Sequence, residues 1–380
     1  MAGSADPVQT RGRRYSPDER EHLNSRFVAR HRATVLLLPV VLLRRLRREH
    51  RAIILNITSA LEIPDRLVAS AMQAALSAAR PWEGATAPNP PVGCTLLDSQ
   101  GRIITTAAHH GAGTLHAEAL AVKQVRETGQ GDRIHTAVVT LEPCNHHGRT
   151  PPCTEALLST SVRRVVIGTA DPNPHVKGGG AAKLRQAGLD VRFFDGDRLE
   201  LERLLGPFRK RVTCGLPWVT VKQAINHGGN MIPPAGQKTF TSQGSLLVAH
   251  ALRRRADAIF TGSGTILADE PKFTVRLLPD HLGKHRSLVL FDRRRRIQDA
   301  YVEAAMANGF CVKFADDLGT ALRRIAAAGG LEVLVEAGPG FTAHVLQGTL
   351  WDEHVKITQT AEGDMINILQ NGGTDVLRHH

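Results

Sequence analysis

A histidine, a glutamate and two cysteines occur in an order that is typical of a catalytic zinc site. His116 and Glu118 open an expected helix, and Cys144 follows an expected strand that ends in Glu142 and Pro143. A catalytic zinc ion takes three protein ligands and leaves a fourth position for water, whose pKa it lowers to roughly 7. Glu118 lies just beyond His116, so its carboxylate can move protons without binding the metal. This pattern predicts hydrolytic deamination of an amino-substituted heterocycle.

The third metal ligand has two candidates. In the common deaminase motif, a Pro-Cys pair is followed at short spacing by a second cysteine. In this sequence His147 occupies the position of that second cysteine. Cys153 comes later and begins an expected helix, whose N-terminus favours a thiolate. His147 keeps the short spacing and Cys153 keeps the softer ligand set, so either side chain could complete the site. A purely structural zinc site is the competing interpretation, and Glu118 beside a ligand argues against it.

The pattern around these residues predicts an α/β domain. Apolar residues recur at helical spacing over 65–80. Alternation of strands and helices predicts a sheet with helices packed over it. We expect strands at 92–97, 103–107, 136–141, 162–169 and 190–194, and helices at 116–126, 153–161, 180–187 and 197–212.

A second alternating series follows Gly215, Leu216 and Pro217, which we expect to form a linker. The chain of 380 residues exceeds the usual size of one compact core, so two domains are the natural expectation. We expect strands at 218–224, 257–261, 287–291, 310–314, 332–336 and 354–359, and helices at 244–255, 317–328 and 340–347. The expected organisation is a basic N-terminal extension of unknown role at 1–64, a deaminase domain at 65–212 and a second α/β domain at 217–380.

The charge of the chain favours anionic partners. The formal net charge is +12, and residues 1–64 contribute half of it with twelve arginines, no lysines and six acids. A phosphorylated small substrate satisfies this balance as well as RNA does. Aromatic residues make up 4% of the sequence, so platforms for stacking bases are scarce. We therefore expect no nucleic-acid partner, and a nucleic-acid-directed deaminase is the less favoured alternative.

Cysteine content and hydropathy predict where the protein works. Five cysteines in a chain of this length argue against a disulfide framework and for a reducing compartment, so we expect a cytoplasmic protein. The apolar run from Thr34 to Leu43 is about half as long as the roughly 20 residues that a membrane-spanning helix needs. We therefore expect no membrane partner.

The motif around the expected metal site resembles the bifunctional riboflavin biosynthesis deaminase/reductase family. The resemblance rests on the stretch from Leu141 to Cys153, and on the segments 89–93, 116–118 and 171–174. It implies a cytidine-deaminase-like three-layer α/β/α domain followed by a dihydrofolate-reductase-like α/β domain. Members deaminate 2,5-diamino-6-ribosylamino-4(3H)-pyrimidinone 5′-phosphate and then reduce its ribosyl group to ribityl with NADPH.

Carried over residue by residue, the resemblance implies Zn²⁺ at His116, Cys144 and Cys153, with Glu118 as the catalytic proton donor. An arginine can bind a phosphate bidentately, which suits the phosphorylated pyrimidine substrate that the family takes. In this domain the implied substrate-binding residues are Asn89, His146, Arg149, Asp171 and Asn173.

In the second domain the resemblance rests on Lys222 with Ala224, on segments within 265–276, and on Glu336 with the glycine loop after it. The implied substrate-binding residues are Arg253, Arg276 and Glu336. The implied NADPH-binding residues are Lys222, Ala224, Thr265, Asp269, Gly338, Pro339 and Gly340. The four arginines at 293–296 could hold the 2′-phosphate of NADPH or form a solvated turn.

The second domain departs from the family pattern at three places. A usually acidic position within 226–230 is glycine, a usual tryptophan is Thr239, and a usual glycine pair is Ala337 with Gly338. The alternative to a bifunctional enzyme is therefore a deaminase whose second domain has lost hydride transfer. In both cases we expect a homo-oligomer.

Overall fold

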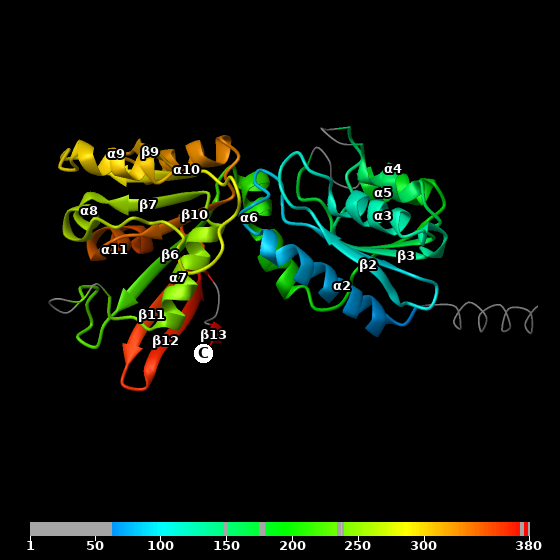
Figure 1. Ribbon diagram of the computed structural model, residues 1–380, viewed down its shortest axis with the longest axis horizontal. Helices are drawn as coiled ribbons and strands as arrows, with labels where there is room; N and C mark the ends of the chain where they lie inside the picture. The colour runs from blue at the N-terminus through cyan, green and yellow to red at the C-terminus, as the bar shows by residue number, and fades with distance from the viewer. Residues whose placement is uncertain are drawn as a thin grey trace, which may run out of the picture. The chain divides into compact units, whose positions relative to one another are not determined.

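The computed structural model describes residues 63–147, 151–174, 179–233, 237 and 239–372, together with the backbone of 376–378. Residues 1–62 of the expected extension at 1–64, and the predicted substrate ligand Arg149, lie outside these residues. The described chain forms two sheets, one from β1 to β5 and one from β6 to β13 (Figure 1). The α/β class expected for both halves is therefore confirmed.

The first sheet is mixed and has the strand order β2-β1-β3-β4-β5. β1 pairs antiparallel with β2 and β3, whereas β3, β4 and β5 run parallel. β3 is buried along its whole length, as a central strand with helices on both faces must be. The strands are β1 (Gly93–Leu97), β2 (Ile103–Ala108), β3 (Thr136–Leu141), β4 (Arg164–Thr169) and β5 (Asp190–Phe193).

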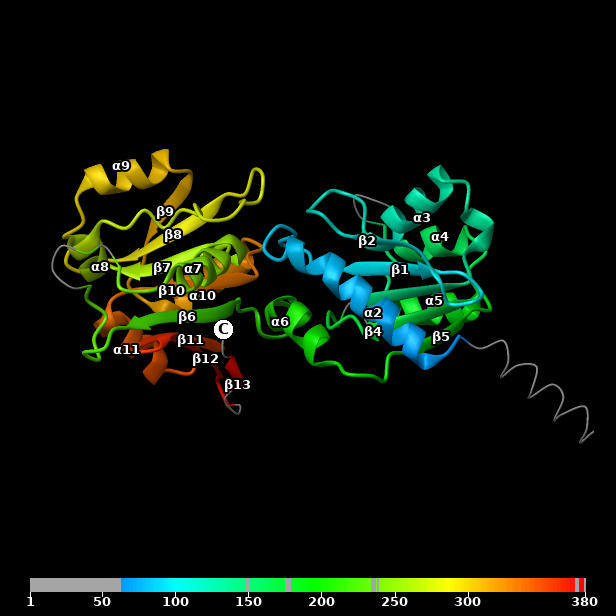
Figure 2. The same ribbon diagram turned by 60° about the horizontal axis from the view of Figure 1, so that its bottom comes forward.

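Helices cover both faces of this sheet (Figure 2). The helices are α2 (Asp65–Ala79), α3 (Ala117–Glu127), α4 (Cys153–Leu158), α5 (Gly179–Gln186) and α6 (Leu199–Cys214). α3, α4 and α5 share one apolar core with the sheet through Val122, Leu157 and Leu184. α2 and α6 share the core on the other face through Met72 and Leu201. The first domain is thus a three-layer α/β/α sandwich.

The second sheet has the order β13-β12-β11-β6-β10-β7-β8-β9. Strands β11, β6, β10, β7, β8 and β9 are parallel, and β12 returns antiparallel to β11. The strands are β6 (Trp218–Ile225), β7 (Ala258–Gly262), β8 (Arg286–Phe291), β9 (Phe310–Phe314), β10 (Glu332–Glu336), β11 (Glu353–Thr360), β12 (Gly363–Gln370) and β13 (Val376–Arg378).

Helices also cover both faces of the second sheet. They are α7 (Gln243–Arg255), α8 (Ser263–Asp269), α9 (Asp299–Ala307), α10 (Leu318–Ala327) and α11 (Pro339–Gln347). α10 and α11 pack on the face that carries Phe260 and Val335, and α7, α8 and α9 pack on the face that carries Ile259 and Leu288. Among the described residues, no helix is long and apolar enough to cross a lipid bilayer.

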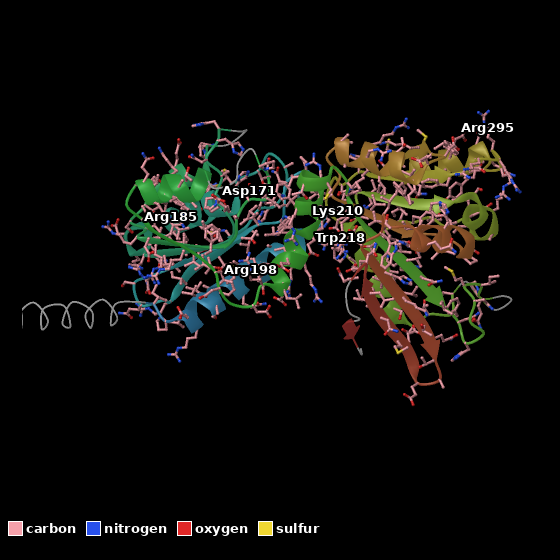
Figure 3. All side chains as sticks on the ribbon, turned by 180° about the vertical axis from the view of Figure 1, so that it is seen from behind. Asp171, Arg185, Arg198, Lys210, Trp218 and Arg295 are labelled. Carbon is pink, nitrogen blue, oxygen red and sulfur yellow. The ribbon has the colours of Figure 1, made fainter. Side chains whose placement is uncertain are left out.

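α6 leads the chain from one sheet to the other. Leu201 belongs to the core of the first domain, whereas Lys210 places its Nζ 2.5 Å from the carboxylate of Asp352 near the start of β11. The backbone N–H of Val219, which follows Trp218 at the start of β6, donates to the same carboxylate of Asp352 at 2.7 Å, and Figure 3 labels Lys210 and Trp218 in this region. Gly215 ends the helix with a φ of 66°, a left-handed conformation that glycine adopts without strain. One helix is therefore packed against residues of both domains.

Candidate active site

The three predicted metal ligands converge at one end of the first sheet. The Nδ1 of His116 lies 3.2 Å from the Sγ of Cys153 and 3.6 Å from the Sγ of Cys144. The three ligand atoms all lie within 4.8 Å of one another, a spacing that lets one ion contact all three. His147, the other candidate for the third ligand, is exposed and lies 3.8 Å from the carboxylate of Glu155. The geometry thus favours Cys153 over His147.

Each ligand occupies the end of a regular element. His116 is the N-cap of α3, Cys153 is the first residue of α4, and Cys144 follows β3. The backbone N–H of Cys153 donates to the Sγ of Cys144 at 3.3 Å, so the first turn of α4 also holds the other thiol. Element ends fix the positions of these groups because the backbone there is anchored by helix and sheet hydrogen bonds.

Hydrogen bonds within the cluster favour a thiolate. The hydrogen bond with Cys153 and the one with His116 lower the pKa of Cys144 to about 4, against the opposing effect of burial. Zinc binds cysteine as the thiolate, so this thiol is prepared for a metal. One imidazole and two thiols form a donor set that suits Zn²⁺ and leaves one tetrahedral position open for water. The residues present therefore fit a catalytic zinc ion.

Glu118 stands in the first turn of α3 and is 3% exposed. Burial raises its pKa, and the nearby Cys144 adds to this rise, while His116 and a hydrogen bond with Cys153 oppose it. A buried carboxyl group with a raised pKa holds a proton more readily than an exposed one. The side chain is thus placed beside the cluster, where a carboxyl group can carry protons.

The predicted pocket residue Asn89 lies on the loop that precedes β1. Its Nδ2 is 3.1 Å from the Nε2 of His109, and the Nδ1 of His109 is 3.0 Å from the carbonyl oxygen of Leu115. The rings of His109 and His116 meet edge to face with their centroids 5.1 Å apart. Asn89 therefore reaches the metal cluster through His109, a residue that the sequence analysis does not single out.

Asp171 and Asn173 follow β4, on the same edge of the sheet as Cys144. The backbone N–H of Asn173 donates to the Asp171 carboxylate at 2.8 Å. Burial raises the pKa of Asp171, and the hydrogen bond from Asn173 lowers it. The charge of Cys144 also raises this pKa, whereas that of His146 lowers it. These predicted substrate residues are therefore near the cluster, and His146 is exposed on the loop beside it.

Glu142 anchors the loop after β4 and the first turn of α5 at this edge of the sheet. Its buried carboxylate accepts hydrogen bonds from the backbone N–H groups of Asp171 at 3.2 Å and Ala181 at 2.9 Å. Gly180 packs so closely that an added Cβ would lie 1.8 Å from the carbonyl oxygen of Pro143. The residue before the Pro-Cys pair thus fixes the loops that carry Cys144 and Asp171.

A second cluster of charged side chains lies in the second domain. The guanidinium of Arg253 donates to both oxygens of Glu336, at 2.7 and 2.8 Å, and the Nζ of Lys222 lies 2.9 Å from the same carboxylate. The pKa of Glu336 is held well below its usual range by Lys222 and Arg253, which outweigh its burial. Three residues predicted to bind substrate or cofactor are therefore brought together.

The other predicted residues of the second domain are more dispersed. The hydroxyl of Thr265 accepts a hydrogen bond from the backbone N–H of Gly338 at 2.7 Å, just before Pro339 at the start of α11. Arg276 is exposed, and its backbone N–H donates to the Nδ1 of His250 at 2.9 Å. Ala224 pairs with Ile357 in the sheet, and Asp269 is exposed at the end of α8.

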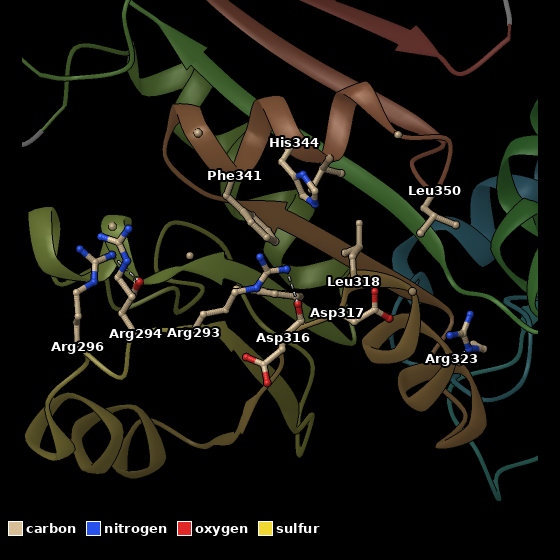
Figure 4. A pocket seen from close by; sticks show the side chains of 18 of the residues that line it. Arg293, Arg294, Arg296, Asp316, Asp317, Leu318, Arg323, Phe341, His344 and Leu350 are labelled. Atoms are coloured by element: carbon tan, nitrogen blue, oxygen red, sulfur yellow. Dashed lines mark hydrogen bonds between the residues drawn. The ribbon is translucent and has the colours of Figure 1, made fainter.

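A cavity of about 830 Å³ opens at the carboxyl ends of β7, β8 and β9, where α11 forms another wall (Figure 4). Arg293, Arg294 and Arg296 line it after β8, and Phe341 and Gly340 line it from α11. Arg293 donates to the carbonyl oxygen of Asp316 at 3.0 Å, and Arg296 to the hydroxyl of Ser263 at 2.9 Å. Ligands of open parallel sheets bind at this edge, and cationic walls suit a phosphorylated one.

Comparison with known proteins finds a matching family for each of the two domains. The family model of the cytidine and deoxycytidylate deaminase zinc-binding region matches residues 66–169, and that of the RibD C-terminal domain matches 217–358. The riboflavin biosynthesis protein RibD of Corynebacterium ammoniagenes is 35% identical over 278 residues, which is 73% of this chain and 81% of that protein. This chain belongs to the RibD family.

Other members of the RibD family support this assignment. RibD of Aquifex aeolicus is 41% identical over 209 residues, 55% of this chain, and the match spans 57% of that protein's length. The structure of Acinetobacter baumannii RibD has a TM-score of 0.69 at 30% identity and covers 78% of this chain and 88% of its own. A Thermotoga maritima structure described as a diaminohydroxyphosphoribosylaminopyrimidine deaminase/5-amino-6-(5-phosphoribosylamino)uracil reductase has a TM-score of 0.67 at 27% identity, covering 82% and 90%.

Membership of the RibD family confirms the cytidine-deaminase-like fold of the first domain and the dihydrofolate-reductase-like fold of the second that the motifs predict. The family comparison leaves the individual site residues as predictions, which the geometry described above supports to different degrees.

Proposed function

We propose that this chain hydrolytically deaminates 2,5-diamino-6-ribosylamino-4(3H)-pyrimidinone 5′-phosphate and then reduces the ribosyl group of the product to ribityl with NADPH. The observation that carries the proposal is the convergence of His116, Cys144 and Cys153 within 4.8 Å, with the buried Glu118 in the adjoining turn. A structural zinc site has no need of a buried carboxylate beside its ligands, whereas a deaminase requires one.

In the deaminase reaction, His116, Cys144 and Cys153 would hold zinc, which when bound supplies an activated water. Glu118 would take a proton from this water and deliver it to the ring nitrogen. It would then move the proton of the hydroxyl group added to the ring onto the amino group, which leaves as ammonia. Its burial keeps bulk water from competing for these protons. Every proton that leaves the water is thereby transferred by one carboxyl group.

The substrate-binding residues proposed for this site are Asn89, His146, Arg149, Asp171 and Asn173. Asn89 is fixed by its contact with His109, and Asp171 is fixed by its Asx turn with Asn173. Amide and carboxylate groups held in this way can recognise the amino and carbonyl edges of a pyrimidinone. The phosphate is assigned to Arg149 on chemical grounds.

For the reductase reaction, we assign NADPH to the cavity at the ends of β7, β8 and β9. Its arginines suit the phosphates, and the absence of side chains at Gly262, Gly264 and Gly340 lets a dinucleotide approach the backbone. Bound there, NADPH supplies a hydride. Thr265, Asp269 and the loop 338–340 would adjoin the cofactor, and Arg253, Arg276 and Glu336 would bind the ribosyl phosphate.

Two further assignments belong to this proposal. All five cysteines are free, which supports work in a reducing compartment, the cytoplasm. We also propose that the protein forms a homo-oligomer, which sedimentation or light scattering of the purified chain tests. The proposed domain bounds are 65–212 and 217–380, with α6 as the connecting helix.

The experiment is incubation of the purified, zinc-loaded chain with the diaminopyrimidinone ribosylamine phosphate, with and without NADPH. We expect one equivalent of ammonia per substrate in both cases, and one equivalent of NADPH consumed only after ammonia is released. Ammonia release without any NADPH oxidation would support the alternative in which the second domain has lost hydride transfer. Absence of ammonia release would refute the proposal.

A further inference from the structure

A segment of the first domain, 80–89, is bound by side chains of the second domain through its backbone carbonyl groups. We call it the junction segment. The guanidinium of Arg254 donates to the carbonyl oxygen of Pro81 at 2.9 Å. The Nε2 of His281 donates to the carbonyl oxygen of Glu83 at 2.8 Å. The Nζ of Lys284 donates to the carbonyl oxygen of Gly84 at 2.5 Å. Arg254 and Lys284 are charged donors, whose hydrogen bonds are among the stronger ones in proteins.

The donors are themselves fixed within the second domain. The side chain of Lys284 is 7% exposed, and its Nζ also donates to the carbonyl oxygen of Arg255 at 2.9 Å and lies 3.2 Å from the carboxylate of Asp257. His281 accepts at Nδ1 from Arg254 at 3.4 Å, which leaves its Nε2 as the donor to Glu83. The donors are therefore prearranged by contacts that do not involve the junction segment.

Gly84 is required where the two domains meet. Its φ is +79°, a conformation that residues with a side chain rarely adopt. A Cβ built on Gly84 would lie 2.3 Å from the carbonyl oxygen of Arg255, and this oxygen is held in turn by Lys284. The close approach of the two backbones thus tolerates no larger residue.

The same segment forms a wall beside the metal cluster. Trp82 stacks on His110 with ring centroids 3.9 Å apart, and the segment ends at Asn89, whose amide contacts His109. His109 meets the metal ligand His116 edge to face. A continuous series of contacts through the junction segment therefore links the second domain to the metal cluster.

We propose that the second domain positions this wall of the deaminase pocket, with Lys284 acting as a positioning residue through Gly84 and the junction segment. The inference rests on the proposed deamination for its readout. It predicts that loosening the junction displaces Asn89 and His109 and weakens substrate binding, while the zinc ligands on α3, α4 and β3 stay in place. The fusion of the two domains then serves the first reaction as well as the second.

The first test is Gly84→Ala, which separates the two backbones without removing any charged group. We expect the KM for deamination to rise about tenfold, with kcat changed less than about threefold and zinc retained at one per chain. Gly129→Ala is the matched control, because Gly129 also has a positive φ, +68°, but a Cβ there meets nothing within 4 Å. Equal KM values for the two variants would overturn the proposal.

The second test approaches the junction from the other side and does not depend on Gly84→Ala folding. Lys284→Met should raise the same KM, whereas Lys313→Met, at an exposed lysine of the same domain, should not. Amide hydrogen exchange of peptides covering 80–92 and 109–116 supplies a readout without turnover, and both peptides should exchange faster in Gly84→Ala and Lys284→Met. Unchanged exchange in both variants would contradict the positioning role of the junction segment. Failure of the wild-type chain to deaminate the substrate would refute only the proposed function, and the exchange measurement would still test the positioning role.

Discussion

The two sites of this chain are built on different physical principles. In the first domain, a histidine and two cysteines converge within 4.8 Å, and their arrangement calls for an ion to complete it. In the second domain, Glu336 is paired with both Lys222 and Arg253, so its carboxylate has partners without an added ion. The first site therefore depends on each ligand, whereas the second depends on ion pairs within the fold.

Removal of one metal ligand should have the largest effect and tests the difference between the two sites most strongly. Cys153→Ser should lose zinc and reduce ammonia release by at least about 10³-fold, because a water activated by the metal cannot form. Reduction of substrate that is already deaminated should continue at the wild-type rate. Zinc analysis and the two separate assays measure this. Cys214→Ser, at an exposed free cysteine, is the control, and a Cys153→Ser protein that keeps its zinc would contradict the ligand assignment.

The second prediction concerns the charge balance around Glu336. Glu336→Gln should lower the free energy of unfolding by about 3 kcal/mol at pH 7, because two buried cations lose their partner. The pKa of Glu336 is lower in the folded protein than in the unfolded chain, where it is near 4.5. The ionised side chain therefore stabilises the fold fully above pH 4.5, and this contribution is lost as the pH falls toward the folded pKa. The difference between wild type and variant, measured by urea unfolding, should therefore shrink below pH 4.5. A difference that stays constant down to pH 3 would contradict this account.

A smaller effect is expected at the cavity of the second domain. Arg293→Ala should weaken NADPH binding about tenfold and leave NADH binding nearly unchanged, because a charge-assisted hydrogen bond to the 2′-phosphate is worth about 1.5 to 3 kcal/mol. Binding is followed by the fluorescence of the reduced nicotinamide. Arg185→Ala, on α5 of the first domain, is the control. Equal weakening for NADPH and NADH would place Arg293 away from the 2′-phosphate.

The contrast between the sites also explains what the sequence could predict. The metal-site motif has characteristic residue types in a fixed order, so His116, Glu118 and Cys144 stand out. The spacing left His147 and Cys153 open for the third ligand, and the structure brings Cys153 together with His116 and Cys144. Most strands and helices were also predictable within a few residues, because buried β-branched runs such as β3 and β10 leave little ambiguity.

Other features lack a local signal. α9 buries only Ala305, so its helical pattern is weak, and β12 owes its place to pairing with β11. α8 coincides with a segment for which the sequence predicted NADPH-binding residues, Thr265 and Asp269, and no helix. The contact of His109 with Asn89 joins residues whose spacing carries no motif. The cavity arises where loops after three strands meet, which only the strand order reveals.

The central claim is that Glu118 moves protons at a zinc site whose ligands do not include it. The most direct measurement is ammonia release by Glu118→Gln, together with its zinc content, under the conditions used for the wild-type chain. The account predicts one zinc per chain and a loss of ammonia release of about 10² to 10⁴-fold. A Glu118→Gln protein that contains zinc and releases ammonia at the wild-type rate would contradict it.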